Sequence, residues 1–223
     1  TSEPTLPSDV ISALPGKFLV FDGPDGSGKS TQLKRLAEVL VAAGLPLCEV
    51  REPGGTELGE RVRRVLLDHT SEPVSARAEV LLYMASRAQL VERRIAPALA
   101  ECHTVLADRF VSSTLAYQGT AGGVDRAEIL DIARVACAQA TPDLVVLFDV
   151  DTETAMARLS PLLRGGELDR MESKGTAFHR RVRQGYLDEA RRDAERYLVV
   201  DASRGPGEVW AEVRRGLVAR FGR

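Results

Sequence analysis

The sequence predicts an α/β fold with a doubly wound, five-stranded parallel sheet flanked by helices. Five short runs of β-branched and aliphatic residues alternate with segments of helical length, as in consecutive βαβ units. These runs are almost continuously apolar, which is typical of strands buried on both faces of a sheet. Four of the five end in Asp, so a polar edge is expected where such folds bind ligands. The predicted strands are residues 17–22, 47–51, 104–108, 144–149 and 197–201.

The first strand leads into a glycine-rich octet that precedes a predicted helix over residues 31–43. Residues 23–30 read GPDGSGKS and match G-x-x-x-x-G-K-[ST], the phosphate-binding loop of P-loop NTPases. Such a loop turns backbone N–H groups toward a triphosphate at a helix N-terminus. We expect Lys29 to reach the β- and γ-phosphates and Ser30 to ligate Mg²⁺. The predicted triphosphate contacts are Gly23, Pro24, Asp25, Gly26, Ser27, Gly28, Lys29, Ser30 and Thr31.

The second strand ends at Arg51, and the turn REPGGT follows it. Arg51 is a candidate phosphate contact, and Pro53 is a candidate for a cis peptide bond. Two helices come next, over residues 57–67 and 76–100. On the second, Tyr83 and Arg87 stand at i and i+4 and share one face, where Tyr83 either lines a site or packs in the core.

The third strand ends in Asp108-Arg109. A carboxylate at this position of a P-loop fold typically holds Mg²⁺ through water, although Asp108 could simply cap a helix. Arg109 can bind a phosphate with both guanidinium branches, or form a surface ion pair. A further helix is predicted over residues 126–138.

The last part of the chain contains a candidate lid over residues 160–175, between helices at 152–159 and 176–193. Two glycines, Gly165 and Gly166, allow hinge motion, and the lid carries Arg164 and Arg170; the alternative is an ordinary solvated loop. The fifth strand and a helix over residues 207–220 complete the fold.

Composition limits the other possibilities. The 223 residues carry a formal net charge of −2 and suffice for one domain over residues 16–223. We expect no nucleic-acid partner, because the charge is balanced, and no membrane partner, because no run approaches about 18 apolar residues. Three scattered cysteines argue against a zinc site and favour a reducing, cytoplasmic location. Residues 1–15 are rich in Ser, Thr and Pro and are expected to be a flexible lead-in.

From about Gly16 to the C-terminus, the chain resembles the thymidylate kinase family. The resemblance rests on the P-loop, REPGGT at 51–56, Asp108-Arg109-Phe110, Tyr117-Gln118-Gly119 and RGGELDR at 164–170, in this order. It implies a homodimeric, Mg²⁺-dependent enzyme that transfers the γ-phosphate of ATP to dTMP and so produces dTDP for dTTP synthesis.

The resemblance also implies roles for individual residues. Arg109 and Arg51 would hold the dTMP phosphate, and the turn at Pro53 would line the nucleotide. Tyr83 would stack on thymine, Arg87 would bond its carbonyl, and Ser113, Thr114 and Gln118 would contact the base edge. Tyr117 would exclude a 2′-hydroxyl and Asp25 would meet the 3′-hydroxyl. The turn at residues 201–203 would pack on adenine.

The source of the catalytic positive charge is a further expectation. Some members of this family carry an arginine within the P-loop, but this chain has Gly26 there. Similar bacterial enzymes supply the arginine from the lid, so Arg164 is the first candidate and Arg170 the second; both would also contact ATP.

Two other functional classes remain open at this point. One is a different kinase of the same superfamily, acting on another monophosphate or on a deoxynucleoside. The other is a non-catalytic nucleotide switch. The chain contains no Asn and therefore lacks the N-K-x-D motif of guanine-nucleotide switches. A pseudo-kinase is less expected, because the candidate catalytic residues are all present.

Overall fold

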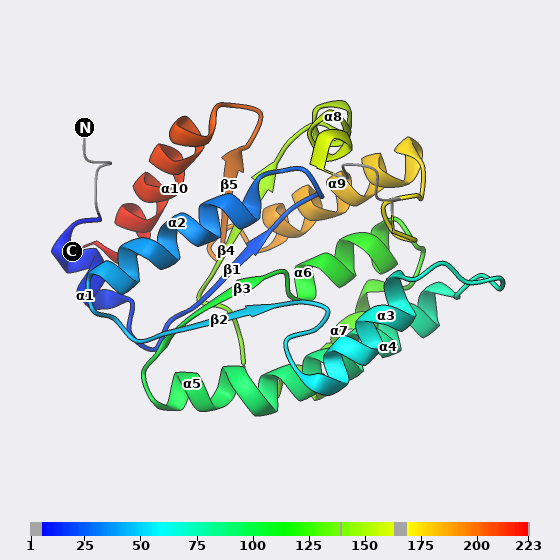
Figure 1. Cartoon of the computed structure of the whole chain (residues 1–223), viewed down its shortest axis with the longest axis horizontal. Coiled ribbons are helices and arrows are strands. Elements are labelled where there is room, and N and C mark those ends of the chain that lie inside the picture. The colour runs from blue at the N-terminus through cyan, green and yellow to red at the C-terminus, as the bar shows by residue number, and fades with distance from the viewer. Residues whose placement is uncertain (1–5, 139, 163–168, 223) are drawn as a thin grey trace.

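A five-stranded parallel sheet forms the centre of the protein, in the strand order β2-β3-β1-β4-β5 (Figure 1). The computed structural model describes residues 6–138, 140–162 and 169–222. The predicted doubly wound α/β fold is confirmed, and four of the five predicted strands have the predicted bounds; the first begins one residue later. The strands are β1 (Phe18–Asp22), β2 (Leu47–Arg51), β3 (Thr104–Asp108), β4 (Leu144–Asp149) and β5 (Tyr197–Asp201).

The strand register brings the polar strand ends to one edge. Arg51 is paired with Asp108 across β2 and β3, and Asp149 with Asp201 across β4 and β5. Asp22 ends β1 in the middle of the sheet, directly before the glycine-rich loop. The loops that follow the strands therefore start from neighbouring points.

Helices cover both faces of the sheet (Figure 1). None of those within the described ranges is long and apolar enough to cross a membrane. The α-helices are α1 (Ser8–Ala13), α2 (Lys29–Ala42), α3 (Glu57–Leu67), α4 (Ala76–Leu90), α5 (Ala96–Ala100), α6 (Val111–Thr114), α7 (Arg126–Cys137), α8 (Thr152–Leu162), α9 (Thr176–Arg192) and α10 (Pro206–Phe221). Two π-helical turns, η1 (Val91–Ile95) and η2 (Leu115–Thr120), lie between helical segments.

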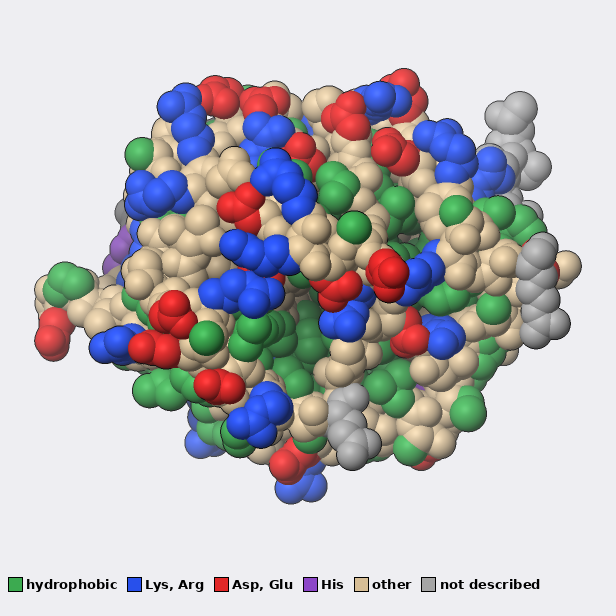
Figure 2. Space-filling model, turned by 180° about the vertical axis from the view of Figure 1, so that it is seen from behind, with side chains coloured by type: hydrophobic (Ala, Val, Ile, Leu, Met, Phe, Trp, Pro, Cys, Tyr) green, Lys and Arg blue, Asp and Glu red, His purple; other side chains and the backbone are tan. Residues whose placement is uncertain are grey.

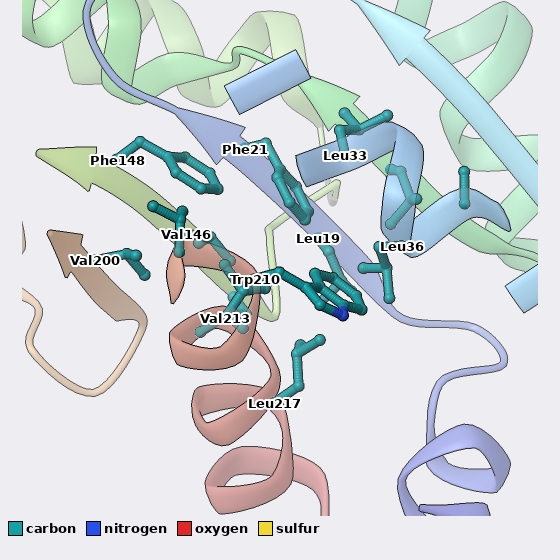
Figure 3. Packing of buried hydrophobic residues seen from close by; sticks show 14 of the residues in the cluster. Leu19, Phe21, Leu33, Leu36, Val146, Phe148, Val200, Trp210, Val213 and Leu217 are labelled. Carbon is teal, nitrogen blue, oxygen red and sulfur yellow. The ribbon is translucent and has the colours of Figure 1, made fainter. Parts of the chain in front are cut away.

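The central strand β1 is buried on both faces, as the continuous apolar pattern predicts. Leu19 and Phe21 point into the cluster formed with α2 and α10, where Trp210 packs close to them (Figure 3). Phe18 and Val20 point into the opposite cluster, formed with α4, η1, α5 and α7. The back of the molecule interleaves basic and acidic side chains around a hollow with hydrophobic side chains on its floor (Figure 2).

The helix predicted over residues 76–100 is interrupted by η1. Pro97, near the start of α5, has no N–H to donate to the carbonyl four residues before it, and its ring crowds that carbonyl. The π-helical turn η1 immediately before Pro97 accommodates this missing hydrogen bond. The other difference is that residues 111–120 form α6 and η2, which the sequence did not predict because the segment is short and rich in Ser and Thr.

The expectation of a flexible segment over residues 1–15 is wrong for its described part. Leu6, Val10 and Leu14 are buried in the same cluster as Trp210, and α1 packs against α10. These three side chains are four residues apart, with Val10 inside α1 and Leu6 and Leu14 on either side of it, a signal hidden among Ser and Pro. Residues 1–5 lie outside the described residues.

We expect Leu14→Ala to lower the free energy of unfolding by about 2–5 kcal/mol, because it leaves a cavity where a fully buried side chain packs. Urea denaturation measures the change. Ser12→Ala, at an exposed position of the same helix, is the control and should change stability by less than about 0.5 kcal/mol. Equal effects of the two substitutions would show that α1 is not part of the cooperative unit.

Candidate active site

The glycine-rich loop connects β1 to the N-terminus of α2. Lys29 is the first residue of α2 and is buried, and Gly28 before it has φ +83°. Gly23 has φ +144°, and a Cβ there would lie 2.6 Å from the carbonyl oxygen of Phe148, so the first turn of the loop requires glycine. The hydroxyl of Ser27 is buried without a partner among the described residues. Such a loop at a helix N-terminus is suited to bind phosphates.

Gly26 lies against α8. A Cβ at this position would lie 2.2 Å from the carbonyl oxygen of Ala155, and φ is +78°. An arginine therefore does not fit here without a shift of α8 or of the loop. In this arrangement of the loop and α8, position 26 has room only for glycine.

Ser30 and Asp108 meet at the open end of the loop. The Ser30 hydroxyl donates a 2.7 Å hydrogen bond to the Asp108 carboxylate. A hydroxyl and a carboxylate are the hard oxygen ligands that Mg²⁺ prefers, and Mg²⁺ in phosphoryl-transfer sites usually has few protein ligands. Across the described ranges, no group of three or more His, Cys, Asp or Glu side chains forms a denser metal site. The pair fits the predicted Mg²⁺ position.

A buried carboxylate, Asp22, organises the start of the loop. It is 0% exposed and accepts hydrogen bonds from the backbone N–H of Gly23 and from the hydroxyls of Ser112, Ser113 and Tyr186, at 2.6–2.9 Å. Each donor comes from a different part of the chain or a different side chain, so the carboxylate joins β1, the loop, α6 and α9. The charge is compensated by these bonds, as buried charges require.

Arg109 is held beside this carboxylate in a strained backbone conformation. Its φ is +75°, in the left-handed region that favours glycine. One guanidinium nitrogen donates to the carbonyl of Gly23 and to the hydroxyls of Ser113 and Tyr186, at 3.0–3.1 Å. The other lies 2.5 Å from the carboxylate of Asp25. Strain of this kind at a charged residue is typical of functional sites.

Asp25 is the acidic member of the loop and is surrounded by donors. Burial alone raises its pKa, but the charges of Arg109 and Lys29 and hydrogen bonds from Arg109 and Tyr117 hold the pKa well below its ordinary value. The Lys29 ammonium is 3.4 Å away and the Tyr117 hydroxyl 3.2 Å away. Asp25 is therefore ionised at neutral pH.

A pocket opens directly beside Asp25 and Arg109. All the predicted acceptor-site residues except Arg51 line it. Its lining comprises Asp25, Glu52, Pro53, Arg63, Leu67, Tyr83, Arg87, Arg109, Ser113, Thr114, Tyr117, Gln118, Asp169, Met171 and Glu172. Aromatic side chains, amide and hydroxyl groups and arginines thus converge on one cavity that touches the phosphate-binding loop.

Arg87 is fixed at the floor of this pocket by a buried ion pair. Arg87 and Glu52 side chains are 1% and 4% exposed, and two guanidinium nitrogens of Arg87 lie 2.5–3.0 Å from the carboxylate. Arg87 also donates to the carbonyl of Phe110 and the hydroxyl of Thr114. Burial raises the pKa of Glu52, while the charge of Arg87 opposes the rise. The peptide bond from Glu52 to Pro53 is cis, as considered from the sequence.

Comparisons with known proteins agree with this geometry. A model of the thymidylate kinase family matches residues 21–213. The chain belongs to the thymidylate kinase family. It is 47% identical over 200 residues to the thymidylate kinase of Pelotomaculum thermopropionicum, covering 90% of this chain and 92% of that one. It is 46% identical over 198 residues to that of Deinococcus radiodurans, covering 89% and 94%.

A solved structure is similar in fold as well. The crystal structure of thymidylate kinase from Ehrlichia chaffeensis aligns with a TM-score of 0.73 and 30% identity, over 91% of this chain and 98% of that chain. Thymidylate kinases are ATP-dependent nucleoside monophosphate kinases, so the nucleotide-switch alternative is set aside in favour of a transferase.

Three further arginines were predicted for this thymidylate kinase site, and the structure gives a different result for each of them. Arg51 is half-exposed and bonds the carboxylate of Glu60 at 3.0 Å, outside the lining of the pocket. Arg170 pairs with Glu79 at 2.6 Å and donates from its other guanidinium nitrogens to the carbonyl of Leu66, so its donors are not directed at the loop. Arg164 lies outside the described residues.

The structure also adds residues that the sequence did not reveal. Glu52, Arg63, Asp169, Met171 and Glu172 line the same pocket as the predicted acceptor-site residues. The sequence did contain a signal for Glu52, because this residue directly follows the last residue of β2, at the edge of the sheet where the strands end. Arg63 comes from a face of α3, and the other three lie within the predicted lid at residues 160–175, where sequence alone does not show which residues are close in space.

A second pocket lies on the other side of the loop. Ser27, Gly28, Thr31 and Gln32 line it together with the turn after β5, which the family resemblance assigns to adenine. Arg158 of α8 fixes this turn by donating to the carbonyls of Ala202 and Ser203, at 2.6 and 2.7 Å. The two pockets meet at the phosphate-binding loop, one on each side.

Proposed function

We propose that this chain transfers the γ-phosphate of ATP to dTMP, producing dTDP and ADP for dTTP synthesis. The observation that carries the proposal is the position of Asp25 and Arg109. Both touch the phosphate-binding loop, and both line the pocket that contains Tyr83 and Gln118. A nucleotide whose base lies in that pocket has its phosphate next to the donor site.

Catalysis in this reaction depends on positioning and on charge. Lys29 would bind the β- and γ-phosphates, and Arg109, with Arg51 as a second contact, would hold the acceptor phosphate in line with them. Asp25 would meet the 3′-hydroxyl, and Tyr117, hydrogen-bonded to Asp25, would fill the space of a 2′-hydroxyl. Arg109 is held beside Asp22 and Asp25, and Tyr117 and Lys29 are held by Asp25, before substrates bind, so these groups need little reorganisation.

Ser30 and Asp108 are the residues that would hold Mg²⁺, Asp108 partly through water. Their oxygen atoms are 2.7 Å apart and open to the phosphate side of the loop. When bound there, Mg²⁺ would supply positive charge that neutralises the charge developing on the phosphates during transfer.

The stabilising arginine is assigned to Arg164. Gly26 excludes one from the loop, and Arg170 has its guanidinium bonded to Glu79 and Leu66. We also propose a cytoplasmic location, because the free cysteines Cys48, Cys102 and Cys137 suit a reducing compartment.

Rates of ADP release with different acceptors test this function. With ATP and Mg²⁺, we expect kcat/KM for dTMP to exceed that for dCMP and AMP by at least about 100-fold, with no transfer to thymidine. dUMP keeps the hydrogen-bonding edge of thymine and should rank second. An enzyme without preference for dTMP would exclude the assignment and favour another monophosphate kinase.

Substitutions of two arginines should have different kinetic effects. Arg109→Ala should mainly raise KM for dTMP, by about 10- to 100-fold, because it removes charged hydrogen bonds to the acceptor. Arg164→Ala should mainly lower kcat, by about 10³-fold or more, with little change in dTMP binding. Steady-state kinetics with each substrate varied separates the two. Arg191→Ala, at an exposed ion pair, is the control; full activity of both variants would disprove the mechanism.

We further propose that the chain is a homodimer through α4 and α7, which pack against each other. Leu81 on α4 is 58% exposed and Val135 on α7 is 76% exposed, and such apolar side chains favour association.

In sedimentation velocity, the wild type should therefore behave as a dimer, and the double variant Leu81→Glu/Val135→Glu as a monomer, because two charges per subunit would be buried unpaired at the interface. Val41→Glu, on α2 at the opposite face of the sheet, is the matched control and should stay dimeric. A dimer that survives the double substitution would place the interface elsewhere.

A further inference from the structure

Glu79 is a buried carboxylate at the rim of the acceptor pocket that the reaction itself does not use. It lies in the first turn of α4 and is 1% exposed. Its oxygens accept hydrogen bonds from Gln118 at 2.9 Å, from Arg170 at 2.6 Å and from Lys174 at 3.1 Å. These three donors supply the hydrogen bonds that a carboxylate buried to this degree requires.

The bond to Gln118 fixes which end of that amide faces the pocket. An ionised carboxylate only accepts hydrogen bonds, so the Gln118 amide must present its Nε2–H₂ group to Glu79. Its Oε1 then lies on the other branch of the planar amide, directed away from Glu79. Because Gln118 lines the acceptor pocket, this oxygen is the atom that it can offer to a base.

Arg170 and Lys174 keep Glu79 in its acceptor form. Burial by itself raises the pKa of Glu79, but hydrogen bonds from Gln118 and Arg170 and the charge of Lys174 bring the pKa below its ordinary value. Arg170 is itself held by the carbonyl of Leu66, at the end of α3. The carboxylate therefore has little freedom to turn or to become a donor.

The orientation of this amide distinguishes pyrimidines. Thymine and uracil carry an N3–H donor between two carbonyl groups, whereas cytosine has an acceptor at N3 and an amino group at C4. An amide oxygen directed at N3 accepts from thymine and repels cytosine. The reversed amide, with its NH₂ group in the pocket, would do the opposite. A buried polar group left without its partner is the strongest basis for rejecting an analogue.

We propose that Glu79 is a positioning residue that selects 4-oxopyrimidine over 4-aminopyrimidine monophosphates by holding the Gln118 amide with its oxygen toward the base. This inference rests on the proposed function, since it needs the acceptor base in this pocket.

Glu79→Gln tests it, because a glutamine at position 79 can donate or accept and so permits both orientations of Gln118. We expect kcat/KM for dTMP to fall about 10-fold or more, and the ratio of kcat/KM for dTMP to that for dCMP to fall by at least about 10-fold. A purely structural role would lower both activities together and leave the ratio unchanged. A ratio within twofold of wild type would therefore overturn the proposal.

Two further variants complete the test. Gln118→Leu leaves the ion pairs of Glu79 in place, so it tests the role of the Gln118 amide even if Glu79→Gln fails to fold. This variant should lose the preference for dTMP over dCMP. A variant that keeps the preference would also overturn the proposal. In the Gln118→Leu background, Glu79→Gln should have no additional effect on the ratio. Glu57→Gln makes the same chemical change at an exposed ion pair on α3, away from the pocket lining, and is the matched control, with the ratio unchanged.

The wild-type enzyme distinguishes this inference from the proposed function. If wild type shows no preference for dTMP over AMP, the function itself is wrong. If wild type prefers dTMP and the variants keep the preference over dCMP, only the role of Glu79 is wrong.

Discussion

The rest of the site depends on a single buried charge at the end of the central strand. The Asp22 carboxylate is removed from solvent, and its hydrogen bonds reach the first residue of the phosphate-binding loop, α6 and α9. Arg109 lies 3.5 Å from the same carboxylate and donates to the hydroxyls of Ser113 and Tyr186, which in turn donate to Asp22. The loop and Arg109 are thus positioned by one group, and the cost of the strained Arg109 backbone is offset by the bonds that converge there.

Paired opposite charges also recur around the pocket that Asp25 and Arg109 line. Arg109 is paired with Asp25, Arg87 with Glu52, and Arg170 with Glu79, and in each pair the carboxylate lies in or beside the pocket wall. An arginine held by a carboxylate loses less rotational freedom when a substrate arrives, and its charge does not need to be desolvated again. The pocket is therefore preorganised without being strongly cationic, which favours recognition of a particular nucleotide over binding of any phosphate.

Sequence reasoning succeeded where the chemistry lies in consecutive residues and failed where it lies between distant ones. The loop at residues 23–30 and the five strands carry their signals locally, in glycine spacing and apolar runs. Glu79, by contrast, contacts residues 39 and 91 positions further along the chain. Tyr186 reaches Asp22 across 164 positions. Only the packing of α4 and α9 against η2, and of α9 against α6, brings these groups together. The helix α1 was missed for a different reason, since its apolar spacing is interrupted by residues that favour turns.

The contact between α8 and the phosphate-binding loop limits which positively charged groups the loop itself can supply. Ala155 occupies the space over Gly26, so the loop can provide backbone donors and Lys29 but no second cation. The same helix fixes the turn after β5 through Arg158, one helical turn beyond Ala155. One helix therefore contacts the phosphate-binding loop and also holds the turn that lines the second pocket. Arg164 follows the end of α8 by two residues in the sequence. The packing of α8 thus accounts both for the steric restriction at Gly26 and for the position of the turn after β5.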